Sequence, residues 1–313
     1  MPSTSAAPIL SIVIVSWNVA DLLAACLRSI ATTCPPSAEV IVVDSASSDE
    51  TVARVRSEFP GFTLLPQPAN VGFSRGTNIG LAAATGGYLL LLNPDTVLLD
   101  QAVPQMMAYL EAHPPVGIVG PRTLNADRSV QSTRRRFPSP LLAAVESTWL
   151  QPLAPRGLLD SYYVRDAADD ATVPVDWVQG SCMLARRQVY TQIGGLDEGF
   201  VMYSEEMDWC RRAKDAGWGV VYLGSAQIIH HGGQSSGQAL AATHIRFNRS
   251  KLRYIRKYHG SLAAQAVRFM LVLHFAAQMM IEAAKWLLGH KRALRRARVL
   301  VYWQVLRSGL RVS

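Results

Sequence analysis

Cysteine is scarce in this chain of 313 residues, which contains only four. None of them forms a Cys-x-x-Cys pair or alternates with histidine at a metal-ligand spacing, which excludes a disulfide scaffold and a zinc finger. Residues 1–5 lack the basic segment and the apolar run of a signal peptide. We therefore expect reduced thiols and a body that stays in the cytoplasm. The cysteines are Cys26, Cys34, Cys182 and Cys210.

Acidic residues are almost absent from the last part of the chain. Residues 240–313 hold 15 Lys and Arg against one acid, Glu282, so this segment carries +14. Residues 1–239 hold 16 Lys and Arg against 22 acids, which gives −6 and returns the net charge of +8. A basic tail behind an acidic body predicts contact with an anionic surface, either lipid headgroups or nucleic acid.

The tail also lacks an uncharged run long enough to cross a bilayer. Its longest stretch without a formal charge is 269–281, shorter than the roughly 20 residues that a spanning helix needs. Four polar side chains within 262–288 fall in one arc of about 80° on a helix. They are His274, Gln278, Glu282 and Lys285. We expect this helix to lie in the membrane interface, with the basic run 291–298 against headgroups. Apolar residues between the charges favour lipid, so no nucleic-acid partner is expected.

Apolar, β-branched runs alternate with segments of helical spacing in the first hundred residues. This order predicts a doubly wound, mostly parallel α/β sheet of the Rossmann-like, nucleotide-binding kind. The expected strands are 9–16, 38–43, 62–66 and 88–92, and the expected helices are 21–31, 49–59 and 75–85. Further helices are expected at 101–112, 187–193 and 204–216, and further strands at 116–120, 173–177, 181–185 and 219–223. The segment 122–172 is expected to be a mobile flap.

Two of the apolar runs stop at a carboxylate, Asp44 and Asp95. The carboxyl ends of parallel strands form the ligand-binding edge of an open α/β sheet. Asp44 is a candidate for accepting hydrogen bonds from a base or ribose, although an Asx turn with Asp49 as a helix cap explains the same pattern. Asn93-Pro94-Asp95 places a carboxylate beside an amide where a diphosphate-bound Mg²⁺ or Mn²⁺ would sit, although it is also typical of an ordinary turn.

Three acids in four positions, Glu205, Glu206 and Asp208, open an amphipathic segment. A carboxylate at a helix start satisfies free backbone N–H groups and complements the helix dipole, which accounts for at least one of them. Another is a candidate general base that takes a proton from an attacking hydroxyl.

Three further features suit an anionic ligand and its metal. His230 offers an imidazole to Mn²⁺ or Mg²⁺, with a structural histidine as the alternative. The loop 70–80 contains three glycines that would let the backbone approach a diphosphate, and Arg75 would pair with that group. A plain turn and helix start explains the same loop. The arginines 134–136 would clamp phosphate or form a solvated charge run.

These residues together resemble family 2 glycosyltransferases with the GT-A fold, and within them the bacterial rhamnosyltransferase-like branch. The matching segments follow the family's order, and the basic tail lies outside them. They are 11–18, 43–49, 70–73, 92–95, 180–184, 194–198, 203–208 and 230–233. We therefore assign a GT-A catalytic domain to 1–239, with 122–172 as a flap over the acceptor, and a basic, membrane-associating helical extension to 240–313.

The resemblance implies an inverting transfer from a nucleoside-diphosphate sugar with the help of Mg²⁺ or Mn²⁺. Asp95 and His230 would hold the metal. Glu206 matches the family's catalytic base, with Glu205 and Asp208 as rivals because the family's Glu-Asp pair is Glu-Glu here. The metal motif begins with Asn instead of Asp. The expected substrate contacts are Ser16, Asn18, Asp44, Asn70, Gly72, Arg75, Asn78, Asn93, Gly180 and Arg135.

By its branch, the chain is expected to use dTDP-rhamnose and a glycan or polyprenyl-diphosphate-linked acceptor in cell-wall or surface-polysaccharide synthesis. The basic tail would hold it on the inner face of the cell membrane. A single in-line displacement needs one base and no covalent intermediate, which agrees with the lack of a nucleophile elbow. The alternatives are a catalytically degenerate nucleotide- or glycan-binding module and a transferase with another donor such as a UDP-hexose. A nucleotidyltransferase would show a glycine-rich signature near the first strand, and residues 11–18 have none.

Overall fold

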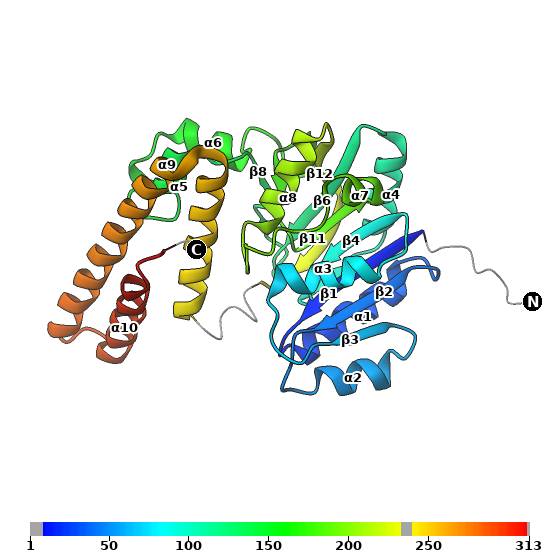
Figure 1. Cartoon of the computed structure of the whole chain (residues 1–313), viewed down its shortest axis with the longest axis horizontal. Helices are drawn as coiled ribbons and strands as arrows, with labels where there is room; N and C mark the ends of the chain where they lie inside the picture. The colour runs from blue at the N-terminus through cyan, green and yellow to red at the C-terminus, as the bar shows by residue number, and fades with distance from the viewer. Residues whose placement is uncertain (1–8, 233–239, 312–313) are drawn as a thin grey trace, which may run out of the picture. The chain divides into compact units, whose positions relative to one another are not determined.

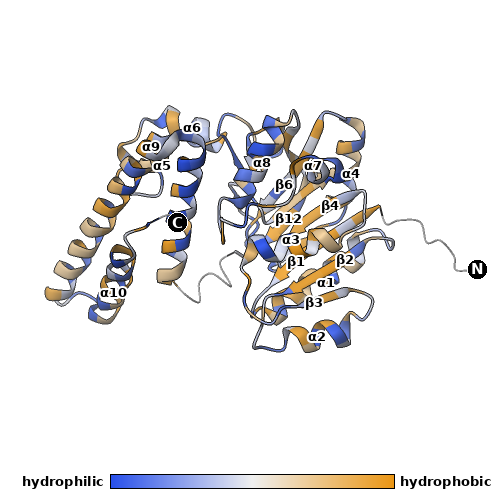
Figure 2. Cartoon of the chain, viewed as in Figure 1, coloured by the Kyte–Doolittle hydropathy of each residue, from blue (hydrophilic) through white to orange (hydrophobic). Residues whose placement is uncertain are grey.

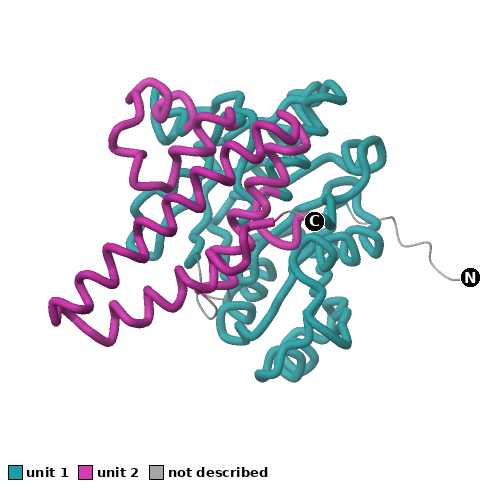
Figure 3. The backbone as a smooth tube through the Cα atoms, turned by 60° about the vertical axis from the view of Figure 1, so that its left-hand side comes forward, with its two compact units in different colours: residues 1–137, 163–199, 205–235 teal, residues 138–162, 200–204, 236–313 magenta. Residues whose placement is uncertain are grey.

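The computed structural model describes residues 9–232 and 240–311, which form two compact units (Figure 3). Unit 1 comprises Met1–Phe137, Tyr163–Gly199 and Glu205–Ser235, and unit 2 comprises Pro138–Tyr162, Phe200–Ser204 and Ser236–Ser313. The first five residues, Gly233 and the expected domain boundary after residue 239 lie outside the described residues. Every candidate catalytic, substrate-binding or metal-binding residue named above belongs to unit 1.

Unit 1 is built on a mostly parallel sheet of ten strands (Figure 1). The strands are β1 (Leu10–Ser16), β2 (Glu39–Asp44), β3 (Thr63–Pro66), β4 (Tyr88–Leu92), β5 (Thr96–Leu98), β6 (Val116–Leu124), β7 (Val130–Gln131), β9 (Thr172–Pro174), β11 (Cys182–Arg186) and β12 (Gly219–His230). Their order is β3-β2-β1-β4-β11-β6-β12-β5, with β7 paired to β6 and β9 paired to β12. Strand β11 runs antiparallel between β4 and β6. The predicted α/β class is confirmed.

Helices cover both faces of this sheet. They are α1 (Ala20–Thr33), α2 (Thr51–Glu58), α3 (Phe73–Ala83), α4 (Ala102–Ala112), α7 (Arg187–Ile193) and α8 (Glu205–Asp215). Successive strand residues point to opposite faces. Thus Ile12 and Ile14 of β1 join a core with residues of α1 and α4, whereas Val13 and Val15 join a core with residues of α3 and α8. Strands buried on both faces must be apolar throughout, which explains the unbroken leucines of β4.

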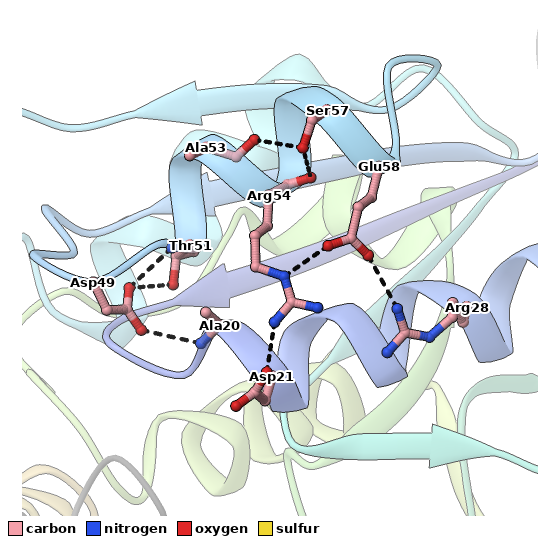
Figure 4. Close-up of polar contacts among 9 residues, drawn as sticks. All are labelled: Ala20, Asp21, Arg28, Asp49, Thr51, Ala53, Arg54, Ser57 and Glu58. Carbon is pink, nitrogen blue, oxygen red and sulfur yellow. Dashed lines mark hydrogen bonds and ion pairs between the residues drawn. The ribbon is translucent and has the colours of Figure 1, made fainter.

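Helices α1 and α2 are joined by an exposed ionic network (Figure 4). Arg54 pairs with Asp21 at 2.5 Å and with Glu58 at 2.7 Å, and Arg28 pairs with Glu58 at 3.1 Å. Solvent screens such pairs, so they contribute little to stability.

Asp49 holds the turn that follows β2. Its carboxylate accepts hydrogen bonds from the backbone N–H groups of Ala20 and Thr51, each at 3.1 Å, and from Thr51 Oγ1 at 2.5 Å (Figure 4). Burial acts to raise the pKa of Asp49, but the hydrogen bonds from Thr51 and Ala20 outweigh it, so the pKa is lowered. Asp49 therefore forms an Asx turn one residue before Glu50, the N-cap of α2, and also binds the first N–H group of α1, so its role in the structure is to hold the loop at these helix starts.

Helix α3 lies close to β1 because two of its residues lack side chains. A Cβ atom at Gly76 would lie 2.8 Å from Val15 Cγ1, and one at Gly80 would lie 2.3 Å from Val13 Cγ1. Gly76 and Gly80 are therefore packing residues under the helix, and the prediction that they let the backbone approach a diphosphate was wrong. Gly72, which precedes α3, has a φ of 77°, a conformation that favours glycine.

The segment 122–172 contains several short elements instead of one continuous loop. β8 (Arg134–Arg135) pairs antiparallel with β10 (Trp177–Val178) in unit 1. Residues 138–162 belong to unit 2 and include α5 (Pro140–Val145), the 3₁₀ helix η1 (Gln151–Leu153) and most of α6 (Arg156–Tyr163).

In unit 2 the basic tail forms α9 (Leu240–Leu287), which is kinked at Gly260, and α10 (Arg292–Ser308). Glu282 of α9 is buried and accepts hydrogen bonds from Arg295 of α10 at 2.7 and 2.9 Å. By length and composition α9 is able to cross a membrane, since an 18-residue window has a mean hydropathy of 1.4 and is 22% buried. Figure 2 shows apolar residues along much of this helix.

Candidate active site

The candidate residues gather where neighbouring strands end at the carboxyl edge of the sheet. Strand β1 pairs in parallel with both β2 and β4, and Ser16 lies opposite Asp44. Farther along the sheet, β12 pairs with β5, where His230 lies opposite Thr96, the residue after Asp95. The topology thus brings both strand-end acids and the histidine to one edge, as the sequence predicted.

Asp44 and Ser16 present buried polar atoms that no described residue satisfies. Asp44 is 1% exposed, and its Oδ2 accepts a hydrogen bond from the Ser47 N–H group at 3.0 Å. Its Oδ1 and the Oγ of Ser16 have no hydrogen-bond partner in the described parts of the chain. Leaving such a group unsatisfied costs about 1–3 kcal/mol, so ligand or water is expected here. A base or ribose supplies suitable donors.

Side-chain amides brace the loops around Asp44. Asn18, with a φ of 53°, accepts a hydrogen bond from the Ser48 N–H group at 2.7 Å through its Oδ1. Asn70 Oδ1 accepts hydrogen bonds from the Gly72 N–H group at 3.0 Å and from Ser45 Oγ at 3.3 Å. These bonds tie the loops after β1, β2 and β3 to one another.

Arg75 and Asn78 both lie in α3 but have different environments. Asn78 Nδ2 donates to Leu196 O at 2.9 Å and to Glu198 Oε1 at 3.0 Å, and its Oδ1 accepts from the Leu196 N–H group at 2.8 Å. Both the nitrogen and the oxygen of this amide are therefore hydrogen-bonded within the protein, and Asn78 holds the turn around Leu196 against α3. Arg75 is exposed in the first turn of the helix, as pairing with a diphosphate requires.

Asp95 and His230 face each other in a largely buried corner. His230 Nε2 lies 3.3 Å from Asp95 Oδ1 and 3.4 Å from Asn93 Nδ2. On the other side of the ring, Nδ1 lies 3.1 Å from Gln131 Oε1. The sequence offered no signal for Gln131, because its contact with His230 joins positions 99 residues apart.

The donor atoms of this corner fit Mg²⁺ or Mn²⁺. Carboxylate oxygen suits both ions, imidazole nitrogen suits Mn²⁺, and Mg²⁺ takes few protein ligands because it keeps water and phosphate oxygens. Within residues 9–232 and 240–311 no three His, Cys, Asp or Glu side chains cluster to hold a metal. The protein would therefore supply two ligands, Asp95 and His230, and leave the remaining positions to phosphate and water.

The three acids at the start of α8 differ in burial. Asp208 is fully buried and accepts a hydrogen bond from Arg212 Nε at 2.9 Å. Glu205 is 5% exposed, and burial, with a further contribution from the Glu206 charge, raises its pKa well above the usual value. Glu206 is the least buried of the three, although its Oε2 atom is inaccessible to solvent, so among these acids Glu206 remains the candidate that an acceptor hydroxyl would meet.

Gly180 and Ser181 connect Glu206 with the Asp95 corner. A Cβ atom at Gly180 would lie 3.3 Å from Glu206 Cβ, so the glutamate side chain lies over this glycine. The Ser181 carbonyl accepts hydrogen bonds from the Asn93 N–H group at 2.9 Å and from Thr96 Oγ1 at 3.3 Å. Ser181 Oγ is buried without a partner among the described residues, which makes it a site candidate that the sequence analysis missed.

The arginines of β8 are engaged within the protein. Arg134 is buried, donates to three backbone carbonyls and pairs with Asp169 at 3.0 Å. Arg134 therefore fixes a turn and does not clamp phosphate. Arg135 donates to Ser132 Oγ at 2.8 Å and lies 4.5 Å from the centre of the Tyr163 ring. Its contact with the substrate stays a prediction.

Known proteins share both the sequence pattern and the fold. The L-rhamnosyltransferase named N-acetylglucosaminyl-diphospho-decaprenol L-rhamnosyltransferase, from Mycobacterium tuberculosis, is 27% identical over 274 residues, which cover 84% of this chain and 89% of that protein. The rhamnosyltransferase WbbL of Escherichia coli is 27% identical over 168 residues, 51% of this chain and 61% of that protein.

Among solved structures, the mannosyltransferase PcManGT from Pyrobaculum calidifontis, in complex with GDP-Man and Mn²⁺, aligns with a TM-score of 0.58 at 19% identity. The alignment covers 99% of this chain and 87% of that chain and shows a common GT-A fold. The family model described as "Glycosyl transferase family 2" matches residues 11–209, which include Asp44, Asp95 and Glu206. The chain is therefore a glycosyltransferase and belongs to glycosyl transferase family 2.

Proposed function

We propose that this glycosyltransferase moves rhamnose with inversion from dTDP-rhamnose to a polyprenyl-diphosphate-linked glycan, in cell-wall or surface-polysaccharide synthesis, and that it needs Mg²⁺ or Mn²⁺. The observation that supports the reaction is the half-buried Glu206 side chain over Gly180, whose neighbour Ser181 bonds through its carbonyl to Asn93 in the corner of Asp95 and His230. The name of the Mycobacterium tuberculosis relative, which aligns with 84% of the chain, supports the rhamnosyl group and the polyprenyl-diphosphate-linked acceptor. The dTDP carrier rests on the resemblance to the rhamnosyltransferase-like branch.

In this mechanism Glu206 accepts the proton of the acceptor hydroxyl as that hydroxyl attacks the anomeric carbon. Ser16 and Asp44 bind the nucleoside through their unsatisfied buried atoms, on an edge shaped by Asn18 and Asn70. Arg75 pairs with the leaving diphosphate. A cation held by Asp95 and His230 would offset the charge of that diphosphate. Asn78 is not part of this donor site, because both polar ends of its amide already form hydrogen bonds with Leu196 and Glu198.

A hexose donor is the second candidate. The low-salt glycan biosynthesis hexosyltransferase Agl10 of Haloferax volcanii is 28% identical over 196 residues, 61% of this chain. A UDP-hexose would use the same base and metal corner, so the two proposals differ only in the sugar and the nucleobase.

Transfer assayed over a panel of nucleotide sugars should identify one preferred donor, and EDTA should abolish turnover until Mg²⁺ or Mn²⁺ is restored. The physical reason is that the negatively charged diphosphate would lie beside the Asp95 carboxylate, and a divalent cation would offset the charge of both groups. Turnover of a UDP-hexose alone would move the assignment to the second candidate. Full turnover in EDTA would contradict the metal requirement.

We also propose that unit 2 binds the surface of the membrane that carries the acceptor. Both long helices combine exposed apolar side chains with the basic residues of the tail. The exposed large apolar residues of these helices and of the turn between them are Leu240, Leu262, Phe269, Leu273, Met280, Ile281, Trp286, Leu287, Leu288, Leu294, Leu300 and Trp303. Burial of such side chains, together with attraction of Lys and Arg to anionic lipids, favours the interface.

The chain should float with anionic liposomes, bind neutral liposomes less and release as salt rises. Replacing both Leu287 and Leu288, which are 71% and 85% exposed, by Ser should weaken binding at least about tenfold, since each buried leucine contributes about 1.5–3 kcal/mol. Leu153→Ser, at a 76% exposed site outside the long helices, is the matched control. Equal flotation of the double variant would exclude this surface as the lipid contact.

A further inference from the structure

The amide of Gln131 has only one orientation that satisfies its neighbours. Its Nε2 donates to the backbone carbonyl of His230 at 2.6 Å and to Asn125 Oδ1 at 2.7 Å. A carbonyl oxygen only accepts, so the amide nitrogen must face it. Asn125 is oriented in turn, because its Nδ2 donates to Ser129 Oγ at 2.8 Å. Gln131 Oε1 is therefore turned toward the imidazole.

The orientation of the Gln131 amide determines which ring nitrogen of His230 carries the hydrogen. Gln131 Oε1 lies 3.1 Å from His230 Nδ1 and can only accept, so Nδ1 must carry a hydrogen to bond with it. In a neutral imidazole the lone pair is then on Nε2, the atom 3.3 Å from Asp95 Oδ1. Asn93 Nδ2, 3.4 Å away, can donate to this lone pair from one side, while the Asp95 oxygen approaches it from the other, and a cation between Nε2 and Oδ1 would remove the repulsion of these two acceptors.

We propose that Gln131 is a positioning residue that holds His230 in the neutral Nδ1–H tautomer and thereby keeps the Nε2 lone pair directed, with Asp95, at a divalent cation. This inference rests on the proposed metal dependence. The β6–β7 hairpin supports it, because the register sets Gln131 opposite Thr123 while Leu124 pairs with Ile229 of β12, next to His230. Partners of this kind on a ligand histidine commonly change metal affinity about 10- to 100-fold.

Nitrogen-15 NMR of the histidine rings in the metal-free protein, at mildly alkaline pH, tests the proposal directly. We expect His230 as the neutral Nδ1–H tautomer, and His113, whose Nδ1 lies 2.8 Å from the Tyr109 carbonyl, as an internal reference for that form. An Nε2–H tautomer, or an imidazolium that donates to Asp95, would overturn the proposal.

Mn²⁺ binding followed by electron paramagnetic resonance, with dTDP present, gives the second readout. Gln131→Leu should weaken Mn²⁺ binding about 10- to 100-fold and abolish the preference for the Nδ1–H tautomer. Gln131→Glu keeps an acceptor for Nδ1–H but loses the donor to the His230 carbonyl, so it should restore the tautomer without the full Mn²⁺ affinity. Unchanged Mn²⁺ affinity in Gln131→Leu would refute the role of Gln131. If the wild type shows the expected tautomer and Mn²⁺ affinity yet transfers no sugar, the proposed function fails while this inference stands.

Discussion

Glu206→Gln should lower kcat by about 10²- to 10⁴-fold and leave donor affinity close to that of the wild type. The amide has nearly the same size and still packs over Gly180, but it cannot take the proton from the acceptor hydroxyl. Steady-state kinetics with saturating donor and acceptor measures kcat, and titration calorimetry with dTDP measures nucleotide affinity. The effect therefore appears in kcat and not in binding.

Glu205→Gln is the matched control for Glu206→Gln. Burial and the Glu206 charge raise the pKa of Glu205, which favours its neutral form, and Gln resembles that form. We expect turnover near the wild-type level. If Glu206→Gln retains its kcat while Glu205→Gln or Asp208→Asn loses it, the base is one of these rivals instead.

Asp208→Asn should reduce the free energy of unfolding by about 3 kcal/mol, since removing one member of a buried ion pair leaves the other charge unpaired. Arg212 is 23% exposed and also donates to the carbonyls of Ile193 and Gly195, which places the cost at the low end of the range for buried pairs. Urea unfolding followed by circular dichroism measures the loss as a lower midpoint with an unchanged slope.

Asp215→Asn supplies the comparison within the same helix. Arg211 and Asp215 have the same four-residue spacing as Asp208 and Arg212, but their side chains are 33% and 56% exposed. An exposed helical pair contributes roughly 0.3–0.5 kcal/mol. Equal losses in Asp208→Asn and Asp215→Asn would show that the Asp208–Arg212 contact is not a buried anchor.

The sequence predicted the sheet and its acidic edge because both arise from local pattern. The runs that end at Asp44 and Asp95 are apolar and short, and parallel pairing of β1 with β2 and β4 follows from the alternation of strand and helix. The sequence also predicted that at least one of the acids at 205–208 stabilises the start of α8 and that another is the general base. The sequence does not show which acid has which role, because that depends on how deeply each carboxylate is buried by residues from other elements.

Contacts between distant parts of the chain were not predictable in the same way. The antiparallel insertion of β11 between β4 and β6 has no local signal. Gly76 and Gly80 were assigned to a ligand because a glycine-rich loop has the same sequence whether the glycines face a phosphate or a strand. The amides of Asn78 and Gln131 bond across 118 and 99 positions, respectively, so only the folded chain reveals their partners.

If the donor binds at the loop before α3, as proposed, the close approach of α3 to β1 helps to determine the space available to it. The loop that contains Asn70 and Gly72 leads directly into α3, and the height of α3 above the sheet depends on Gly76 and Gly80 lying against valines. A methyl group at Gly80 would have to displace Val13 or lift the helix, and the loop would rise with it. A change of donor preference in this fold can therefore originate in the core, at a position that no ligand touches.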